Sequence, residues 1–267
     1  MILLATIDET PLRLTSLEEL YLSSNLFRNN TISFLEGLPN LKSLDMYNNT
    51  LQGSLDIKGL SNLTNLKKLD LSDNQIESFQ SFKDGDRKLK LIHLEEVYLD
   101  RNLFNSSVFA FLNKLSNLKY LSISGNQLKG SIDMKEIKGL RNLEIVYLDH
   151  VFTDGSIPLQ NLVEAFSSVK SFYLQESYLN MTRTTQELNV SSNGEELYFD
   201  FSSLNTNILQ GIGVFSSLKT LSSCGLIGSL PNEGWCDLWN LEVLDETIFK
   251  FHCHSHHLQT FQTSKFF

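Results

Sequence analysis

Residues 14–27 read LTSLEELYLSSNLF, in which Leu or Phe recurs at fixed positions and one Asn stands near the end. The frame L-x-x-L-x-x-L-x-L-x-x-N-x-F returns four times, as LPNLKSLDMYNNTL (38–51), LTNLKKLDLSDNQI (63–76), LIHLEEVYLDRNLF (91–104) and LSNLKYLSISGNQL (115–128). Five windows in one register are far more than chance matching gives. The first half of the chain is therefore built from an internal repeat.

The frame continues with losses through the second half. Further windows begin at Leu140, Phe166, Leu197, Phe215 and Leu238. The position of the Asn is taken there by Val151, Ser177 and Ser202. The first apolar residue of each L-x-L core stands at 20, 44, 69, 97, 121, 146, 172, 197, 221 and 244.

Each L-x-L core reads as a short strand whose outer two side chains point inward and whose middle side chain points outward. One repeat cannot bury its apolar face alone, so neighbouring repeats must stack. The frame therefore predicts an α/β-type repeat fold: a leucine-rich-repeat solenoid of about ten repeats with a parallel β-sheet on its concave side. We expect buried side chains at Leu20, Leu22, Leu69, Leu71, Leu121 and Ile123.

The Asn residues of the frame should stack as a ladder, because an amide can satisfy backbone groups at the strand exit that water cannot reach. These residues are Asn25, Asn49, Asn74, Asn102 and Asn126. Ser177 and Ser202 can do part of this, whereas Val151 cannot, and a local irregularity is expected there. The polar stretches 78–90 and 181–196 are expected to be loops.

Several motifs carry a resemblance to a known family. LQGSL (51–55), LKGSI (128–132), GSIP (155–158) and GSLP (228–231) follow the plant-type extension L-x-G-x-I/L-P. Over residues 14–245 the chain resembles the leucine-rich-repeat ectodomain of plant receptor-like proteins. The resemblance implies a peptide or protein ligand and a co-receptor kinase, with a role in defence or development. It also implies a parent protein on the outer face of the plasma membrane.

Composition excludes several other classes. The chain has 267 residues, 41% of them hydrophobic, and a net charge of −9, which argues against a nucleic-acid-binding groove. No apolar run approaches the 18 residues of a transmembrane helix, and no intact signal peptide is visible. The sequence contains no G-x-S-x-G, H-E-x-x-H or P-loop motif and no kinase motif, so we expect neither an enzyme nor a cofactor.

The sequence divides into a remnant N-terminal segment (1–13), a leucine-rich-repeat domain (14–245) and a non-repeat tail (246–267). The missing cap and the tail suggest a truncated or mis-spliced product; a genuine adaptor tail is the alternative. His252, Cys253, His254, His256 and His257 lack the spacing of a tetrahedral zinc site, so no metal is expected. Cys224 and Cys236 are read as small buried residues, with a mutual disulfide as the alternative.

The candidate ligand-binding surface lies on the concave face. The middle residue of the strand core is aromatic at Tyr98, Tyr147, Tyr173 and Tyr198, and the next outward position adds Asp100, Asp149 and Asp200. Tyrosine supplies contact area at low entropic cost, and a border of carboxylates favours a partner that carries Lys or Arg. The alternative is an ordinary solvated strand face, because Tyr suits strands.

Sequons for N-glycosylation supply a second set of candidates, although their number is near that expected by chance. The candidates are Asn29, Asn62, Asn105, Asn180 and Asn189. Asn48 also begins a sequon but stands at a strand exit, so it should be unglycosylated or mark the edge of the binding surface. Two rival functions stay open: a soluble inhibitor resembling the polygalacturonase-inhibiting proteins, and a non-functional gene fragment.

Overall fold

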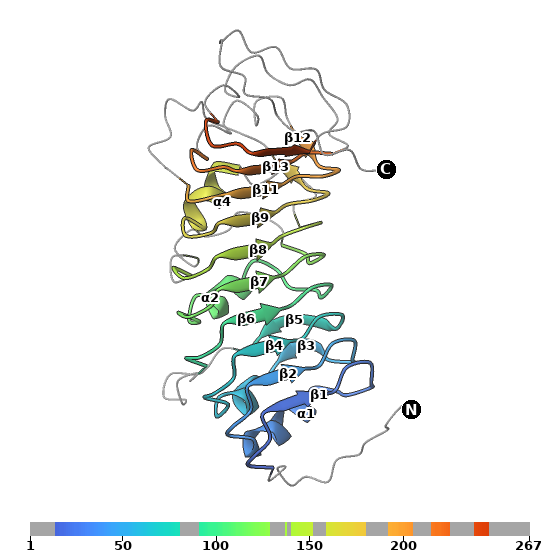
Figure 1. Ribbon diagram of the computed structural model, residues 1–267. Helices are drawn as coiled ribbons and strands as arrows, with labels where there is room; N and C mark the ends of the chain where they lie inside the picture. Colours follow the sequence, from blue (N-terminus) through green and yellow to red (C-terminus); the bar gives the residue numbers. More distant parts are fainter. Residues whose placement is uncertain are drawn as a thin grey trace, which may run out of the picture. The chain divides into compact units, whose positions relative to one another are not determined.

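A computed structural model describes residues 14–80, 91–128, 137, 140–151, 159–179, 192–204, 215–224 and 238–245 (Figure 1). The chain divides into two compact units, unit 1 over residues 1–128 and unit 2 over residues 129–267. Each unit is a parallel-strand solenoid. The expected segments 1–13 and 246–267 lie outside the described residues.

In unit 1 the predicted strand centres lie in five short strands that form a parallel sheet. These are β1 (Glu19–Tyr21), β2 (Ser43–Asp45), β4 (Lys68–Asp70), β6 (Glu96–Tyr98) and β7 (Tyr120–Ser122). The centres pair with one another in register, as in Leu44 with Leu69 and Val97 with Leu121. The predicted register is confirmed in this unit.

Unit 2 repeats the arrangement with five further strands at the predicted positions. They are β8 (Ile145–Tyr147), β9 (Ser171–Tyr173), β11 (Glu196–Tyr198), β13 (Thr220–Ser222) and β14 (Val243–Asp245). Phe172 pairs with Leu197, and Leu221 pairs with Leu244. The degenerate windows therefore keep the same register as the regular ones.

Each unit also has a small second sheet, which the frame alone does not predict. In unit 1, β3 (Gln52–Leu55) pairs with β5 (Gln75–Phe79), and in unit 2, β10 (Tyr178–Leu179) pairs with β12 (Ser203–Leu204). The expectation of a loop over 78–90 is wrong at Ser78 and Phe79, because both extend the pairing with β3. Residues 81–90 and 181–191 lie outside the described part of the chain.

Short helical turns connect the strands. They are α1 (Thr31–Phe34), η1 (Leu35–Gly37), η2 (Lys58–Leu60), α2 (Val108–Leu112) and α4 (Leu159–Ala165). Gly59 allows η2 to approach α1, because a Cβ atom at this position would lie 1.9 Å from the carbonyl oxygen of Ile32. Among the described residues no helix is both long enough and apolar enough to span a bilayer.

The core is filled from both sides of each repeat. Leu69, Leu71, Leu121 and Ile123 are buried as predicted. Leu20 and Leu22 are only half-buried, so that part of the prediction is wrong. The reason is that, among the described strands, β1 has a neighbour on one side only, β2.

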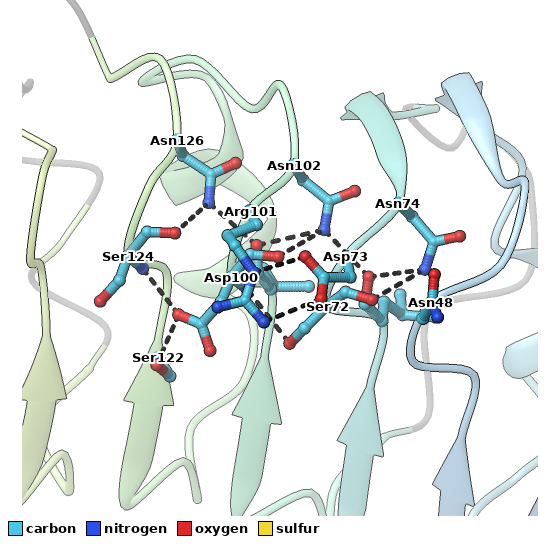
Figure 2. Close-up of polar contacts among 12 residues, drawn as sticks. Asn48, Ser72, Asp73, Asn74, Asp100, Arg101, Asn102, Ser122, Ser124 and Asn126 are labelled. Atoms are coloured by element: carbon cyan, nitrogen blue, oxygen red, sulfur yellow. Dashed lines mark hydrogen bonds and ion pairs between the residues drawn. The ribbon is translucent and has the colours of Figure 1, made fainter. Parts of the chain in front are cut away.

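The predicted asparagine ladder is present in unit 1 (Figure 2). The amide nitrogen of Asn102 donates to the carbonyl oxygens of Leu71 (2.9 Å) and Leu99 (3.2 Å), and its Oδ1 accepts from the N–H of Ile76 (2.9 Å). Leu71 and Ile76 belong to the preceding repeat. The side chain therefore hydrogen-bonds both to the backbone of its own repeat and to the backbone of the preceding repeat. Asn49, Asn74 and Asn126 make the same bond to the preceding repeat.

The residue before each ladder position adopts a left-handed backbone conformation. Its φ is positive at Ser24, Asn48, Asp73, Arg101, Gly125, His150, Glu176 and Phe201. This conformation turns the chain out of the strand in both units. His150 also has this conformation, with a φ of 55°, so the turn before Val151 is regular. Residues 152–158 lie outside the described part of the chain.

Serine replaces the asparagine in unit 2 with fewer bonds, as predicted. The hydroxyl of Ser202 donates to the carbonyl oxygen of Leu174 (2.8 Å) and accepts from the N–H of Ser177 (3.1 Å). Both partners belong to the preceding repeat. The shorter side chain thus keeps one donor and one acceptor contact across the repeats.

Replacing Leu121 by Ala should lower the free energy of unfolding by about 2–5 kcal/mol, because it removes a fully buried side chain and leaves a cavity. Leu26, which is 48% exposed, is the control, and its replacement by Ala should cost less than half as much. Urea unfolding followed by circular dichroism measures both. Equal losses would mean that the inward and outward positions have been assigned wrongly.

Candidate functional site

Three tyrosines form a continuous row on the sheet of unit 2. The ring centroids of Tyr147 and Tyr173 lie 3.9 Å apart with an interplanar angle of 7°, and those of Tyr173 and Tyr198 lie 4.4 Å apart at 4°. Neighbouring strands are about 4.8 Å apart, so residues in register on adjacent strands are spaced for ring stacking. The structure thus brings together three of the four predicted tyrosines.

The two predicted carboxylates of unit 2 lie beside this row and are partly used by the backbone. Asp149 accepts from the N–H of Gln175 (2.8 Å), and Asp200 accepts from the N–H of Cys224 and the hydroxyl of Ser222 (both 2.7 Å). These bonds fix the direction of both side chains. The border of the tyrosine row is therefore rigid as well as acidic.

Lysines near the row are paired with glutamates. Lys170 lies 3.4 Å from Glu144, and Lys219 lies 2.5 Å from Glu195. Each pair joins consecutive repeats at the entry to the strands. Exposed pairs of this kind contribute little to stability, but they neutralise the two lysines and leave the surface beside the tyrosines with a negative character.

Tyr98 belongs to a different cluster in unit 1. Its ring lies 4.8 Å from that of Tyr120 at an angle of 36°, and Lys68 Nζ lies 4.7 Å from its centroid. The Tyr98 hydroxyl donates to Glu96 (3.1 Å). The sequence grouped Tyr98 with the other three tyrosines because of its position in the repeat. It did not predict that Lys68 and Tyr120 are the side chains in contact with the Tyr98 ring.

Asp100 is a half-buried structural acceptor in the same unit (Figure 2). Its Oδ1 accepts from the hydroxyl of Ser122 (2.6 Å) and from the N–H of Ser124 (2.7 Å). Burial raises the pKa of Asp100, while these two hydrogen bonds oppose the shift. Next to it, the guanidinium of Arg101 forms a two-pronged contact with the carboxylate of Asp73.

The pKa values of Tyr98, Tyr173 and Tyr198 are raised above the usual value of a tyrosine. Burial is the largest cause for Tyr98, Tyr173 and Tyr198, and the pKa of Tyr98 reaches about 12 with further help from Glu96. For Tyr173 the second cause is a hydrogen bond with Tyr147. The hydroxyl groups of these three tyrosines therefore remain protonated over the physiological pH range, so the three side chains are uncharged.

The described sequons at Asn29, Asn62 and Asn105 fall outside the strands of the large sheets, whereas Asn48 stands at the exit of β2. The Asn29 amide donates to Gln52 O (2.8 Å) and accepts from Gln52 N–H (2.9 Å), while Asn105 Oδ1 accepts from Ser107 N–H (2.9 Å). Asn62 is half-buried, and Asn48 Nδ2 donates to the Ser24 hydroxyl (3.2 Å). Asn180 and Asn189 lie outside the described residues.

The cysteine and histidine predictions fall largely outside the described residues. Cys224 is half-buried, whereas Cys236 and the histidines at 252–257 are not described. Among the described residues no group of three His, Cys, Asp or Glu side chains is arranged to hold a metal ion.

Comparison with known proteins identifies the repeat. Residues 39–84 match the family model described as leucine-rich repeats (two copies), and residues 117–140 match the model of a single leucine-rich repeat. Cuscuta receptor 1 from Solanum lycopersicum is 31% identical over 76% of this chain and 20% of its own length. Receptor-like protein 13 from Arabidopsis thaliana is 39% identical over 49% of this chain and 12% of its own length. The chain thus spans a fifth or less of these relatives.

Solved structures agree on the fold. An internalin from Listeria monocytogenes has a TM-score of 0.58 at 21% identity, covering 87% of this chain and 67% of its own. A TDR receptor has a TM-score of 0.60 at 22% identity, covering 87% of this chain and 39% of its own. These similarities confirm the leucine-rich-repeat solenoid, and the curated relatives confirm the predicted resemblance to plant receptor-like proteins.

A spectrophotometric titration tests the environment of the tyrosines. Because folding raises these pKa values, the stability they contribute is present below pH 10 and is lost as the pH rises through the folded-state pKa. The Tyr98→Phe variant should lack a tyrosinate transition near pH 12 that the wild-type chain shows before it unfolds. A Tyr98 that ionises near pH 10 in the folded chain would contradict the described contacts.

Asp100 offers a matched pair of variants. Asp100→Ala leaves the Ser122 hydroxyl and the Ser124 N–H without their acceptor and should cost about 1–3 kcal/mol in the free energy of unfolding. Asp100→Asn keeps an acceptor oxygen and removes a half-buried charge, so its cost at pH 7 should be less than half of that. Chemical denaturation measures both; equal costs would show that the charge, not the acceptor, matters.

Proposed function

Since this chain is a leucine-rich-repeat protein related to the plant receptor-like proteins, we propose that it is a ligand-recognition module. Its recognition surface is the tyrosine row of unit 2, defined by Tyr147, Tyr173 and Tyr198, with Asp149 and Asp200 at its border. The ligand is a peptide or a protein segment. The stacked geometry of the three rings carries this proposal.

The tyrosine row has the properties of a protein contact surface. The three rings are half-buried, and they pack against one another. Stacking fixes their rotamers before a ligand arrives, so little side-chain entropy is lost on binding. Tyrosine is enriched among the residues that dominate binding energies at protein interfaces.

The charge around the row favours a basic ligand. Asp149 and Asp200 lie along the exit side of the strands, and the nearby lysines are neutralised by glutamates. Complementary charge speeds association and rejects acidic competitors, particularly at low salt. A segment with Lys or Arg flanking an apolar residue fits this surface.

The receptor context is also part of the proposal. The named relatives are a receptor and a receptor-like protein, which favours a receptor over a soluble enzyme inhibitor. In that setting the parent protein lies on the outer face of the plasma membrane and signals in defence or development through a co-receptor kinase. Asn29, Asn62, Asn105, Asn180 and Asn189 are the proposed glycosylation positions, with Asn180 and Asn189 outside the described residues.

Panning a random peptide library against the 267-residue chain, followed by affinity measurements, tests the recognition surface. The selected peptides should be rich in Lys and Arg. The double variant Tyr147→Ala, Tyr173→Ala should bind them about tenfold or more weakly, because two aromatic contacts of about 1 kcal/mol each are lost. Circular dichroism checks that the variant is folded.

The matched control is the double variant Tyr21→Ala, Tyr178→Ala, which removes two exposed tyrosines outside the row. It should bind the selected peptides with wild-type affinity. If the row variant keeps wild-type affinity for every selected peptide, the recognition surface lies elsewhere on the chain.

A further inference from the structure

One exposed aromatic residue of unit 2 lies close to the tyrosine row without belonging to it. Phe201 stands three residues after Tyr198 and directly after Asp200, and it is 65% exposed. Among the described residues no other aromatic ring lies against it. The rings of the tyrosine row stack on one another, whereas the ring of Phe201 faces solvent.

The backbone conformation at Phe201 disfavours a large side chain. Its φ is 55°, in the left-handed region, where the Cβ atom of an L-residue is crowded. The matching positions of the other described repeats carry polar residues or glycine: Ser24, Asn48, Asp73, Arg101, Gly125, His150 and Glu176. The repeat imposes this conformation whichever residue stands there, so the turn itself does not require a phenylalanine.

Side chains at the matching positions contact one another along the solenoid. In unit 1 the guanidinium of Arg101 donates to the carboxylate of Asp73, and in unit 2 His150 Nδ1 lies 3.2 Å from Glu176 Oε2. Phe201 takes the place of the next polar residue after Glu176. Its ring cannot continue this series of polar contacts and exposes apolar surface instead.

The neighbouring repeats hold the backbone of Phe201 in place. Its N–H donates to the carbonyl oxygen of Cys224 in the following repeat (2.7 Å). The carbonyl oxygen of Asp200 accepts from the N–H of Glu176 in the preceding repeat (3.0 Å). Strained residues that their surroundings hold in this way cluster at ligand-binding and switch sites. An exposed ring in such a conformation therefore indicates a ligand contact rather than a packing role.

Carboxylates lie on two sides of Phe201. Asp200 precedes it in the sequence, and Glu176 occupies the matching position of the preceding repeat. Among the described residues, Oδ2 of Asp200 accepts a hydrogen bond from Gln175 Nε2 alone (3.3 Å), so it can accept another. A ligand residue in contact with Phe201 thus has acidic neighbours, which favour a Lys or Arg next to it in the ligand.

We propose that Phe201 binds a large apolar side chain of the ligand and that Asp200 binds a Lys or Arg close to it. This inference rests on the proposed function, because it adds a defined position to the same ligand. The Cα atoms of Tyr198 and Phe201 are at most about 11 Å apart, so a short segment can contact both. The ligand is therefore a segment in which a large apolar residue stands within two positions of a basic one.

Panning the peptide library in parallel against the wild-type chain and a Phe201→Asn variant tests this inference. Asparagine suits the position, because Asn48 has the same conformation at the matching place, with a φ of 52°. Peptides selected by the wild type should carry Leu, Ile, Met or Phe within two positions of Lys or Arg. Peptides selected by the variant should keep Lys and Arg but show no preferred apolar position.

A double-mutant cycle measures the contact directly. It combines Phe201→Asn with the strongest wild-type peptide and the same peptide with its apolar residue replaced by Ser, followed by fluorescence anisotropy. The wild-type chain should bind the original peptide about fivefold or more tightly than the serine peptide, because apolar surface is buried on the ring. Phe201→Asn should bind the two peptides within about twofold of each other. The control Trp239→Ala, which removes an aromatic residue that is 78% exposed and precedes β14, should keep the wild-type preference.

Thermal unfolding separates a ligand contact from a packing role. Phe201→Asn should unfold at the wild-type temperature or above it, because the change relieves a strained residue and removes an exposed apolar ring. An unfolding temperature clearly below that of the wild type would show that the ring stabilises the fold, and would overturn the inference.

Two binding results would also overturn it. One is a preference for the apolar residue that survives in Phe201→Asn, and the other is a set of wild-type peptides rich in Lys and Arg without a preferred apolar position. Both results leave the proposed function intact, because that fails when the Tyr147→Ala, Tyr173→Ala variant keeps its wild-type affinity for the selected peptides. The experiments therefore distinguish a wrong contact residue from a wrong recognition surface.

Discussion

The side-chain amide at the exit of each strand is the contact on which unit 1 depends. Asn102 binds carbonyl groups of two consecutive repeats and accepts an N–H from the earlier one. A buried amide makes these bonds in one geometry only, so it fixes the step from each repeat to the next. The outward residues of the strands of unit 1 consequently fall into rows.

Unit 2 keeps this arrangement with a weaker version of the same contact. Ser202 ties its repeat to the preceding one through one donated and one accepted bond, and Val151 supplies none. The strands still pair in register, because the apolar core and the ladder of backbone bonds are retained. The tyrosine row is thus held by core packing and ring stacking where the amide ladder is lost. A recognition surface that is rigid without an amide ladder is the structural basis of the proposed function.

The sequence predicted the repeat, the strand register and the buried ladder, because each depends on residue types at a fixed spacing. It also placed Tyr147, Tyr173 and Tyr198 in register. It could not show that Asp100, Asp149 and Asp200 accept hydrogen bonds from the following strand, because those bonds depend on rotamers. The small second sheets and the Lys68–Tyr98 contact were missed for a different reason: they arise between repeats, outside the frame of a single window.

Residue-resolved hydrogen exchange in an Asn102→Ala variant tests whether the amide ladder fixes the step between repeats. The N–H of Ile76 donates to Asn102, whereas the N–H groups of Leu51 and Phe104 donate to Asn74 and Asn126. Ile76 should lose about tenfold or more of its protection while Leu51 and Phe104 keep most of theirs, since only one acceptor is removed. Protection of Ile76 that stays at the wild-type level would contradict the claim that the amide ladder fixes the step between repeats.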